Sequence, residues 1–335
     1  MRPYVEVGAF ARPLLLDAGD TITGRSHDLT IASMEATLAS MEATVRWVGI
    51  TAIAPVAWGT NYYVTHHFLP TDYPLYGAAI RALPAGLLLL LLRRRLPRGA
   101  WWWKSAILGI LNVGAFFTLI YVAAQLLPTS VASTVMALSP VVMMLFAWSL
   151  VSERPRVAHL AGATVGIAGV CLMLLTGVGR IDPIGVLASV TAMVMSSAGF
   201  ILAKRWSTGM DLISVTSWQL VAGGVLLLPF AVAFEGAPPA LDLTSLLGFS
   251  YVSVVATAVA FAAWFTGLRH LPAGTVGLIG LLNPVTGVLL GTAVAGEGLA
   301  GQQVCGLVLV TVGMLLGQPV LMRLAGRTRR RTLTG

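Results

Sequence analysis

The sequence predicts an all-α membrane protein with ten transmembrane helices, arranged as two related halves of five. Three observations predict this fold: an apolar composition, ten long apolar segments, and a one-sided distribution of basic residues. Of the 335 residues, 57% are hydrophobic and 10% are charged, whereas a soluble globular chain carries about 25% charged residues. Because this chain cannot cover its surface with polar groups, we expect it to lie in a bilayer.

Ten segments are each about as long and as apolar as a membrane-spanning helix. About 20 apolar residues cross the hydrocarbon region as a helix, and barrel strands are excluded because the segments are too long and too uniformly apolar. In chain order the predicted spans are 47–66, 74–92, 103–125, 129–151, 158–177, 183–203, 213–233, 245–268, 273–295 and 302–321.

The loop charges predict the orientation of these spans. If the N-terminus is cytoplasmic, sixteen Lys and Arg residues from Arg46 onward fall in the cytoplasmic loops and the C-terminal tail, and Arg180 is the single basic residue in an outer loop. This asymmetry satisfies the positive-inside rule at every loop, and removing one span would destroy it. We therefore expect a multi-pass protein of the inner or plasma membrane with both termini in the cytoplasm.

The polar N-terminal segment, residues 1–45, has no apolar stretch long enough for a signal peptide, and we expect a disordered cytoplasmic tail. It contains a tandem repeat, residues 33–37 and 40–44, from which we hypothesise that translation starts at Met34 or Met41. Detection of any peptide upstream of Met34 by mass spectrometry would contradict that hypothesis.

An internal repeat relates the two halves of the chain. Pro140 precedes Glu153 by 13 residues, and Pro284 precedes Glu297 by the same interval, 144 positions later. The earlier helices align at an offset of 138. We therefore divide the chain into repeats 46–177 and 178–322, followed by a basic cytoplasmic tail, 323–335. Five spans per repeat, an odd number, invert the second copy in the membrane, and inverted repeats are typical of secondary transporters.

These motifs give the sequence a specific resemblance. The chain resembles the EamA-type transporters of the drug/metabolite transporter superfamily in the first-helix residues 58–61 (Trp-Gly-Thr-Asn), in Arg81, and in the two Pro-to-Glu helices. The resemblance covers residues 46–322. It implies ten helices in two repeats, and export or exchange of small metabolites such as amino acids. The second copy departs from the pattern, with Gln219 opposite Arg81 and Gly298 opposite Arg154.

Arg81 is the most informative candidate for a substrate-binding residue. It lies about twelve residues, or ~18 Å of helix, from the basic cluster that begins at Arg93. A central arginine costs roughly 2.5–3.5 kcal/mol on insertion scales and should face the bundle interior or a wet cavity. There it either attracts a substrate carboxylate or has a structural role, held by carbonyl groups.

Other polar and aromatic side chains within the spans are candidates for the same site, because a small-molecule site is an apolar pocket with a few polar groups. Packing between helices is the alternative for each of them. Together with Arg81, the predicted substrate-binding residues are Trp58, Asn61, Tyr62, Tyr121, Ser197, Trp218, Gln219 and Trp264.

Two prolines and two glutamates are gating or structural candidates. Pro140 and Pro284 are expected to kink equivalent helices, as a gate or as a static bend. We interpret Glu153 and Glu297, at helix ends, as partners in ion pairs or as helix caps rather than as proton carriers.

The sequence also argues against several classes of protein. It contains no hydrolase, P-loop or metal-ligand motif, so we expect no enzyme, catalytic residue, cofactor or metal. The basic residues follow membrane topology rather than nucleic-acid binding, and one arginine does not make a channel filter. A lipid-handling or scaffold protein stays open as an alternative. Three Gly-x-x-x-Gly patterns predict close helix packing, within the chain or at a homodimer face.

Overall fold

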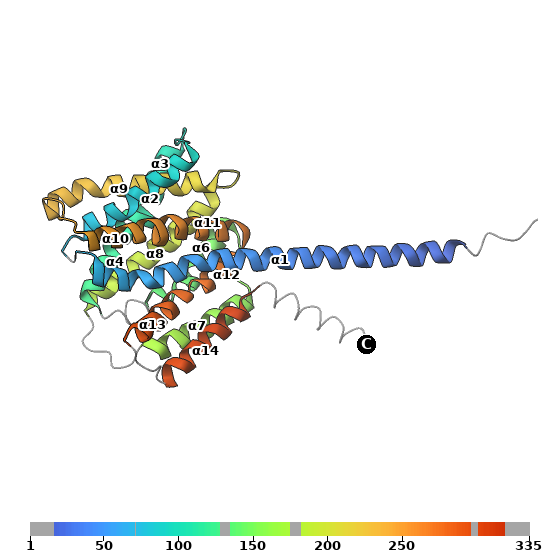
Figure 1. Cartoon of the computed structure of the whole chain (residues 1–335). Helices are drawn as coiled ribbons and strands as arrows, with labels where there is room; N and C mark the ends of the chain where they lie inside the picture. Colours follow the sequence, from blue (N-terminus) through green and yellow to red (C-terminus); the bar gives the residue numbers. More distant parts are fainter. Residues whose placement is uncertain (1–16, 71, 128–134, 175–181, 296–300, 319–335) are drawn as a thin grey trace, which may run out of the picture. The chain divides into compact units, whose positions relative to one another are not determined.

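A computed structural model describes residues 17–70, 72–127, 135–174, 182–295 and 301–318 (Figure 1), and within these ranges the chain forms helices and turns without strands. The helices are α1 (Asp17–Phe68), α2 (Pro74–Arg93), α3 (Trp101–Gly109), η1 (Ile110–Gly114), α4 (Ala115–Leu126), α6 (Ser139–Val151), α7 (Val157–Leu174), α8 (Pro183–Trp206), α9 (Leu212–Glu235), α10 (Leu243–Ser253), η2 (Val254–Val259), α11 (Ala260–His270), α12 (Ala273–Ile279), α13 (Leu282–Ala295) and α14 (Gly301–Leu316). Six helical stretches among the described residues are long and apolar enough to cross a membrane.

The chain divides into two units at Val45, and α1 contributes to both. Residues 17–45 are helical, so the prediction of a disordered tail is corrected for them, whereas residues 1–16 lie outside the described residues. No glycine or proline interrupts residues 25–48, and Ala, Met, Glu and Leu in that stretch favour a helix.

Glycines bring α7 and α14 into close contact along their length (Figure 1). A Cβ atom built on Gly162 would lie 2.5 Å from the Gly313 carbonyl oxygen, and one built on Gly169 would lie 2.7 Å from that of Gly306. The predicted Gly-x-x-x-Gly packing is therefore confirmed for these helices. Because their glycine faces are occupied within the chain, they are not available as the homodimer face.

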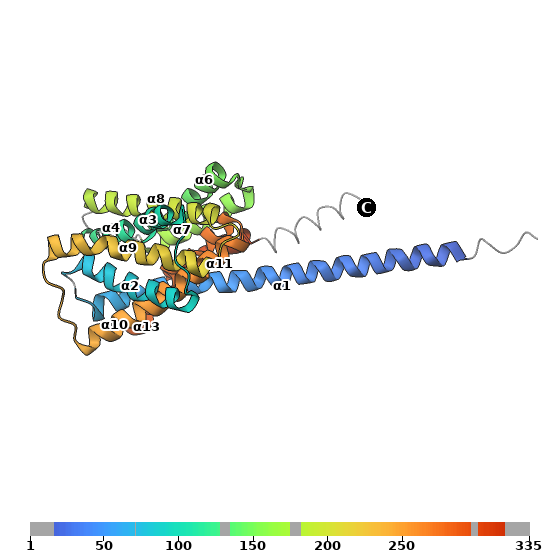
Figure 2. The ribbon, with the colours of Figure 1, turned by 90° about the horizontal axis from the view of Figure 1, so that it is seen from above.

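Helices α2 and α9 pack against each other and are tied together at both ends (Figure 2). At one end the Glu235 carboxylate accepts hydrogen bonds from the backbone amides of Leu75 and Tyr76, at 2.5 and 2.9 Å. It thereby caps the first turn of α2, where backbone N–H groups lack helical partners. The Tyr76 hydroxyl also donates to the Gly236 carbonyl oxygen at 2.8 Å.

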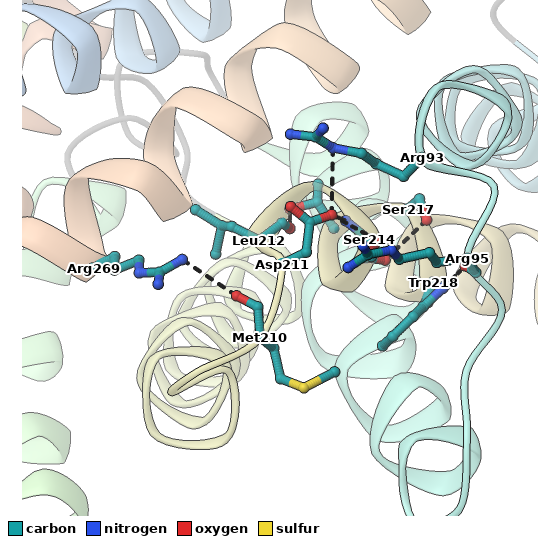
Figure 3. Close-up of polar contacts among 10 residues, drawn as sticks. Arg93, Arg95, Met210, Asp211, Leu212, Ser214, Ser217, Trp218 and Arg269 are labelled. Carbon is teal, nitrogen blue, oxygen red and sulfur yellow. Dashed lines mark hydrogen bonds and ion pairs between the residues drawn. The ribbon is translucent and has the colours of Figure 1, made fainter.

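At the other end, Asp211 precedes α9 and joins its first turn to the end of α2 (Figure 3). The Asp211 carboxylate accepts hydrogen bonds from the Ser214 hydroxyl and backbone amide, at 2.6 and 3.0 Å, and lies 3.4 Å from Arg93 Nε. Burial raises the pKa of Asp211, but the hydrogen bonds and then the charges of Arg93 and Arg95 outweigh burial and lower the pKa below its ordinary value.

Replacing Asp211 with alanine is expected to lower the melting temperature in detergent at pH 7, because loss of such a cap costs about 0.5–2 kcal/mol. A carboxyl whose pKa is lowered by folding stabilises the protein above its ordinary pKa of about 3.9, and this stabilisation is lost as the pH falls through the lowered pKa. The difference from the wild type should therefore vanish in strongly acid buffer. Asp211→Ser, which keeps a capping hydroxyl but not the charge, should recover most of the loss. A pH-independent difference would contradict this account.

Pro140 and Pro284 do not kink continuous helices, which corrects the prediction. Pro140 is in the first turn of α6, and Pro284 is in the first turn of α13. A proline is tolerated there because the missing N–H would have no helical partner. Each helix begins after a short turn, at residues 137–138 and 280–281. The two spans are therefore broken at equivalent positions.

Candidate functional site

A cavity of about 120 Å³ lies among helices from both repeats. A single water needs roughly 10–15 Å³ of such space, so the cavity can hold several waters or a small solute. Its wall is formed by Trp58, Asn61, Arg81, Phe116, Phe117, Ile120, Met136, Ala137, Ser139, Met143, Ser196, Ser197, Phe200, Phe261, Trp264, Gly280, Leu281, Asn283 and Pro284. The broken ends of α6 and α13 therefore contribute directly to it.

Aromatic rings from α1, α8 and α11 pack together on one side of the cavity. The Trp58 ring centroid lies 5.2 Å from that of Trp264 and 5.6 Å from that of Phe261. Phe200 lies 5.5 Å from Trp264. These separations fall in the range of favourable aromatic pairs, so the rings form a fixed apolar surface that a flat or aliphatic part of a solute can contact.

Arg81 is held on the cavity wall by η2, a π-helical turn in the middle of the stretch from α10 to α11. Its Nε donates to the Thr257 hydroxyl at 2.8 Å, and one terminal nitrogen donates to the Ala256 carbonyl oxygen at 3.2 Å. The guanidinium carbon lies 4.2 Å from the centroid of the Phe117 ring, a cation–π contact. The same Ala256 carbonyl accepts from Trp58 Nε1 at 3.0 Å. A single turn therefore positions both cavity residues.

Three buried polar atoms of the cavity residues lack a hydrogen-bond partner among the described residues. They are Asn61 Oδ1, Ser197 Oγ and Trp264 Nε1. A buried polar group without a partner costs about 1–3 kcal/mol, and such groups are satisfied by water or ligand in most proteins. Together they offer one acceptor, one donor and one hydroxyl that can do either.

Gln219 is buried and does not line this cavity, and its role in substrate binding stays a prediction. Its Oε1 accepts a hydrogen bond from Asn112 Nδ2 at 2.9 Å, and Asn112 lies in η1, the π-helical turn between α3 and α4. The repeat offsets relate Gln219 to Arg81 and Asn112 to Ala256. The Gln219–Asn112 contact is thus the counterpart of the Arg81–Ala256 contact in the other repeat.

Trp218 and Tyr121 also lie outside the cavity wall, and their predicted role in substrate binding stays a prediction. Trp218 is 6% exposed, packs against Trp101, and donates from Nε1 to the Arg95 carbonyl oxygen at 2.7 Å (Figure 3). The Tyr121 hydroxyl donates to the Pro70 carbonyl oxygen at 3.3 Å. Both side chains therefore bind carbonyl groups of neighbouring loops, Trp218 from the second turn of α9 and Tyr121 from the middle of α4. The Tyr62 side chain and Glu297 lie outside what the structure describes.

Glu153 forms both of the contacts that its position at a helix end predicts. Its Oε1 lies 2.5 Å from Lys204 Nζ, and its Oε2 accepts from the backbone amide of Ala273 at 2.9 Å, at the start of α12. These contacts are an ion pair and a cap on the first turn of α12. The contact also joins the first repeat to two helices of the second.

Apolar helices of membrane length thus surround a cavity to which both halves of the chain contribute. The sequence profile of the EamA-like transporter family matches residues 45–175 and again residues 183–317. The chain belongs to the EamA-like transporter family and carries two copies of its domain.

Two of the three relatives described next are named as a transporter or an efflux pump, and the name of the other states no activity. The chain is 35% identical to Protein PecM of Dickeya dadantii (strain 3937) over 80% of this chain and 90% of that protein. It is 27% identical to an uncharacterized inner membrane transporter, YedA, of Escherichia coli (strain K12), over 78% and 89% of the two chains. A probable amino-acid metabolite efflux pump of Salmonella typhimurium is 25% identical over 80% and 93%.

A solved crystal structure shares the fold, with a TM-score of 0.69 and 22% identity over 82% of this chain and 99% of that chain. The family match, the relatives named as transporters and the six apolar helices of the described residues together identify a multi-pass membrane transporter.

Proposed function

We propose that this chain is a secondary transporter that exports small metabolites such as amino acids, by alternating access between two inverted five-helix repeats. In this proposal ten helices span the membrane, residues 46–177 and 178–322 form the repeats, and both termini are cytoplasmic. The cavity is the substrate site. The name of the amino-acid metabolite efflux relative supports this substrate class.

Some contacts in one repeat are related to contacts in the other by the offset of 144, and this relation supports the inverted arrangement. An offset of 144 converts the pair Gly162–Gly313 into the pair Gly306–Gly169, and both pairs are in close contact. The π-helical turns η1 and η2 begin 144 positions apart, at Ile110 and Val254. Two copies with the same internal contacts can exchange conformations, which is the basis of alternating access in inverted-repeat transporters.

The observation that carries the proposal is the cavity wall, which combines an aromatic surface with unpartnered polar atoms and Arg81. The wall is suited to an amphipathic solute: the rings contact its apolar part, while Asn61, Ser197 and Trp264 bind its polar edge. Arg81 supplies positive charge for a carboxylate. Discontinuous helices at such a site are a recurrent feature of secondary transporters.

The test is transport by the full chain reconstituted in liposomes loaded with a mixture of labelled amino acids. We expect flux of one or more of these amino acids. In Asn61→Ala we expect the flux to fall roughly tenfold or more, because this variant loses a buried hydrogen bond between uncharged groups to the substrate. Trp218→Phe is the matched control, because this aromatic residue lies outside the cavity wall, and it should retain most of the flux.

The alternative function is tested in the same vesicles. Scrambling of a labelled phospholipid without flux of any small polar solute would overturn the proposal in favour of lipid handling. Equal loss of flux in Asn61→Ala and Trp218→Phe, with both variants folded, would contradict the placement of the site.

A further inference from the structure

A second cavity, of about 450 Å³, lies where the loop between α6 and α7 meets the end of α11 and the start of α12. It is separate from the aromatic cavity, and the two share no residue of their walls. Its polar wall residues are Glu153, Arg154, Arg156, His159, Lys204, Arg269 and His270. Both repeats contribute to it, and its wall includes four Lys and Arg residues and one carboxylate.

The one carboxylate of this basic cavity is already engaged. Glu153 binds Lys204 and the Ala273 amide, and Lys204 also donates to the Leu271 carbonyl oxygen at 3.0 Å. Arg154 and Arg156 are exposed, and no carboxylate of the described residues lies within ion-pair distance of either. Their guanidinium groups therefore offer charge and donors that the described part of the chain does not use.

The loop that carries these arginines is constrained. Ser152 ends α6 in the left-handed region at φ 58°, the Glu153 amide donates to the Ala147 carbonyl oxygen at 3.1 Å, and Pro155 separates the two arginines. A loop ordered in advance loses less conformational entropy when a ligand binds.

An exposed apolar surface continues from this cavity along α7. Val157, next to Arg156, is 83% exposed, and Leu160, one turn further on, is 44% exposed. Ala161, Thr164 and Ala168 are exposed at the following positions of the same helical face. Positive charge thus adjoins an apolar stripe of a helix that belongs to a membrane protein.

We propose that the basic cavity binds the phosphate group of an anionic phospholipid, with an acyl chain along the exposed face of α7. Arginine pairs strongly with phosphate oxygens, and basic pockets between membrane helices bind anionic headgroups. Because Glu153, Lys204 and Ala273 connect the two repeats beside the phosphate, the lipid stabilises their junction. Binding does not depend on the transport proposal, since it needs no flux.

The experiment uses the purified full chain in nanodiscs of phosphatidylcholine with increasing phosphatidylglycerol, and native mass spectrometry of the retained lipid. The variant Arg154→Gln/Arg156→Gln is compared with Arg98→Gln/Arg205→Gln, which removes two exposed arginines outside the cavity. A charge-assisted hydrogen bond from an arginine of the cavity to a phosphate oxygen contributes at least about fivefold in affinity, and an arginine outside the cavity makes no such bond. We therefore expect phosphatidylglycerol retention to weaken roughly 25-fold in the cavity variant and to change little in the control.

Three outcomes would overturn the proposal. They are equal weakening in both variants, equal retention of phosphatidylcholine and phosphatidylglycerol by the wild type, and saturable stabilisation by inorganic phosphate in detergent that displaces the lipid. The last outcome would assign the cavity to free phosphate. If the double variant does not fold, the single pair Arg156→Gln and Arg205→Gln decides between the same results.

Discussion

Replacing Gly162 with leucine is expected to leave almost no folded protein after extraction in detergent. The Cβ atom alone would lie 2.5 Å from the Gly313 carbonyl oxygen, and this neighbour is backbone and cannot rotate away. The whole of α14 would have to move. Overpacking of a well-filled core by extra methylene groups costs typically 1–3 kcal/mol, and leucine adds several groups at a helix–helix contact. Size-exclusion profiles and melting temperatures measure the loss.

Gly77 provides the matched control, because a Cβ atom built on this α2 residue meets nothing within 4 Å. Gly77→Ala should be neutral or stabilising, since alanine gains about 1 kcal/mol over glycine inside a helix. Gly306→Leu, at the position that the repeat relates to Gly162, should be as damaging as Gly162→Leu. A Gly162→Leu protein with a wild-type melting temperature would contradict the close packing of α7 on α14.

The sequence predicts most of the helices because their lengths are imposed by the bilayer. Apolar segments and the basic residues between them locate α2, α8 and α9 to within a few residues. It also identifies several cavity residues, among them Arg81 and Asn61, because charged and amide groups inside apolar segments are costly and therefore face inward. These residues are conspicuous for a physical reason.

The rotation of each helix is much harder to predict. In α9, Trp218 and Gln219 have the composition of site residues, but the helix turns them toward the loop at Arg95 and toward Asn112. In a membrane protein the lipid-facing side is as apolar as the core, so hydrophobic periodicity gives no direction. For the same reason, no feature of the sequence distinguishes the cavity residues Phe117, Phe200 and Phe261 from aromatic residues that face lipid.

The sequence predicts where two of the helices are interrupted, but it does not predict the conformation of the interruption. Pro140 and Pro284 indicate an irregularity at equivalent positions, and the structure has a turn before each proline rather than a kink at it. The π-helical turns η1 and η2 have no proline at all. η1 packs on α2, α8 and α9, and η2 packs on α2, and π-helical turns often lie at functional sites. Tertiary contacts, rather than local propensity, determine them.

The change Arg81→Gln is expected to reduce transport strongly while leaving the protein folded. Glutamine occupies the repeat-related position 219 and is fully buried there, hydrogen-bonded to η1. A neutral amide at position 81 can therefore be accommodated, with the Ala256 carbonyl oxygen as acceptor. The positive charge on the cavity wall is lost. Hydrogen bonds to charged groups contribute about 1.5–3 kcal/mol, so substrate flux in liposomes should fall by roughly ten- to hundredfold.

Arg81→Lys separates the charge from the geometry of this residue. Lysine keeps the charge but lacks the Nε–H that binds Thr257 and the planar group that stacks on Phe117. If charge in the cavity is what the substrate requires, Arg81→Lys retains measurable flux and Arg81→Gln does not, at similar melting temperatures. If Arg81 only holds η2 in place, both variants lose stability together and flux falls in proportion. Full flux in a folded Arg81→Gln protein would remove Arg81 from the substrate site.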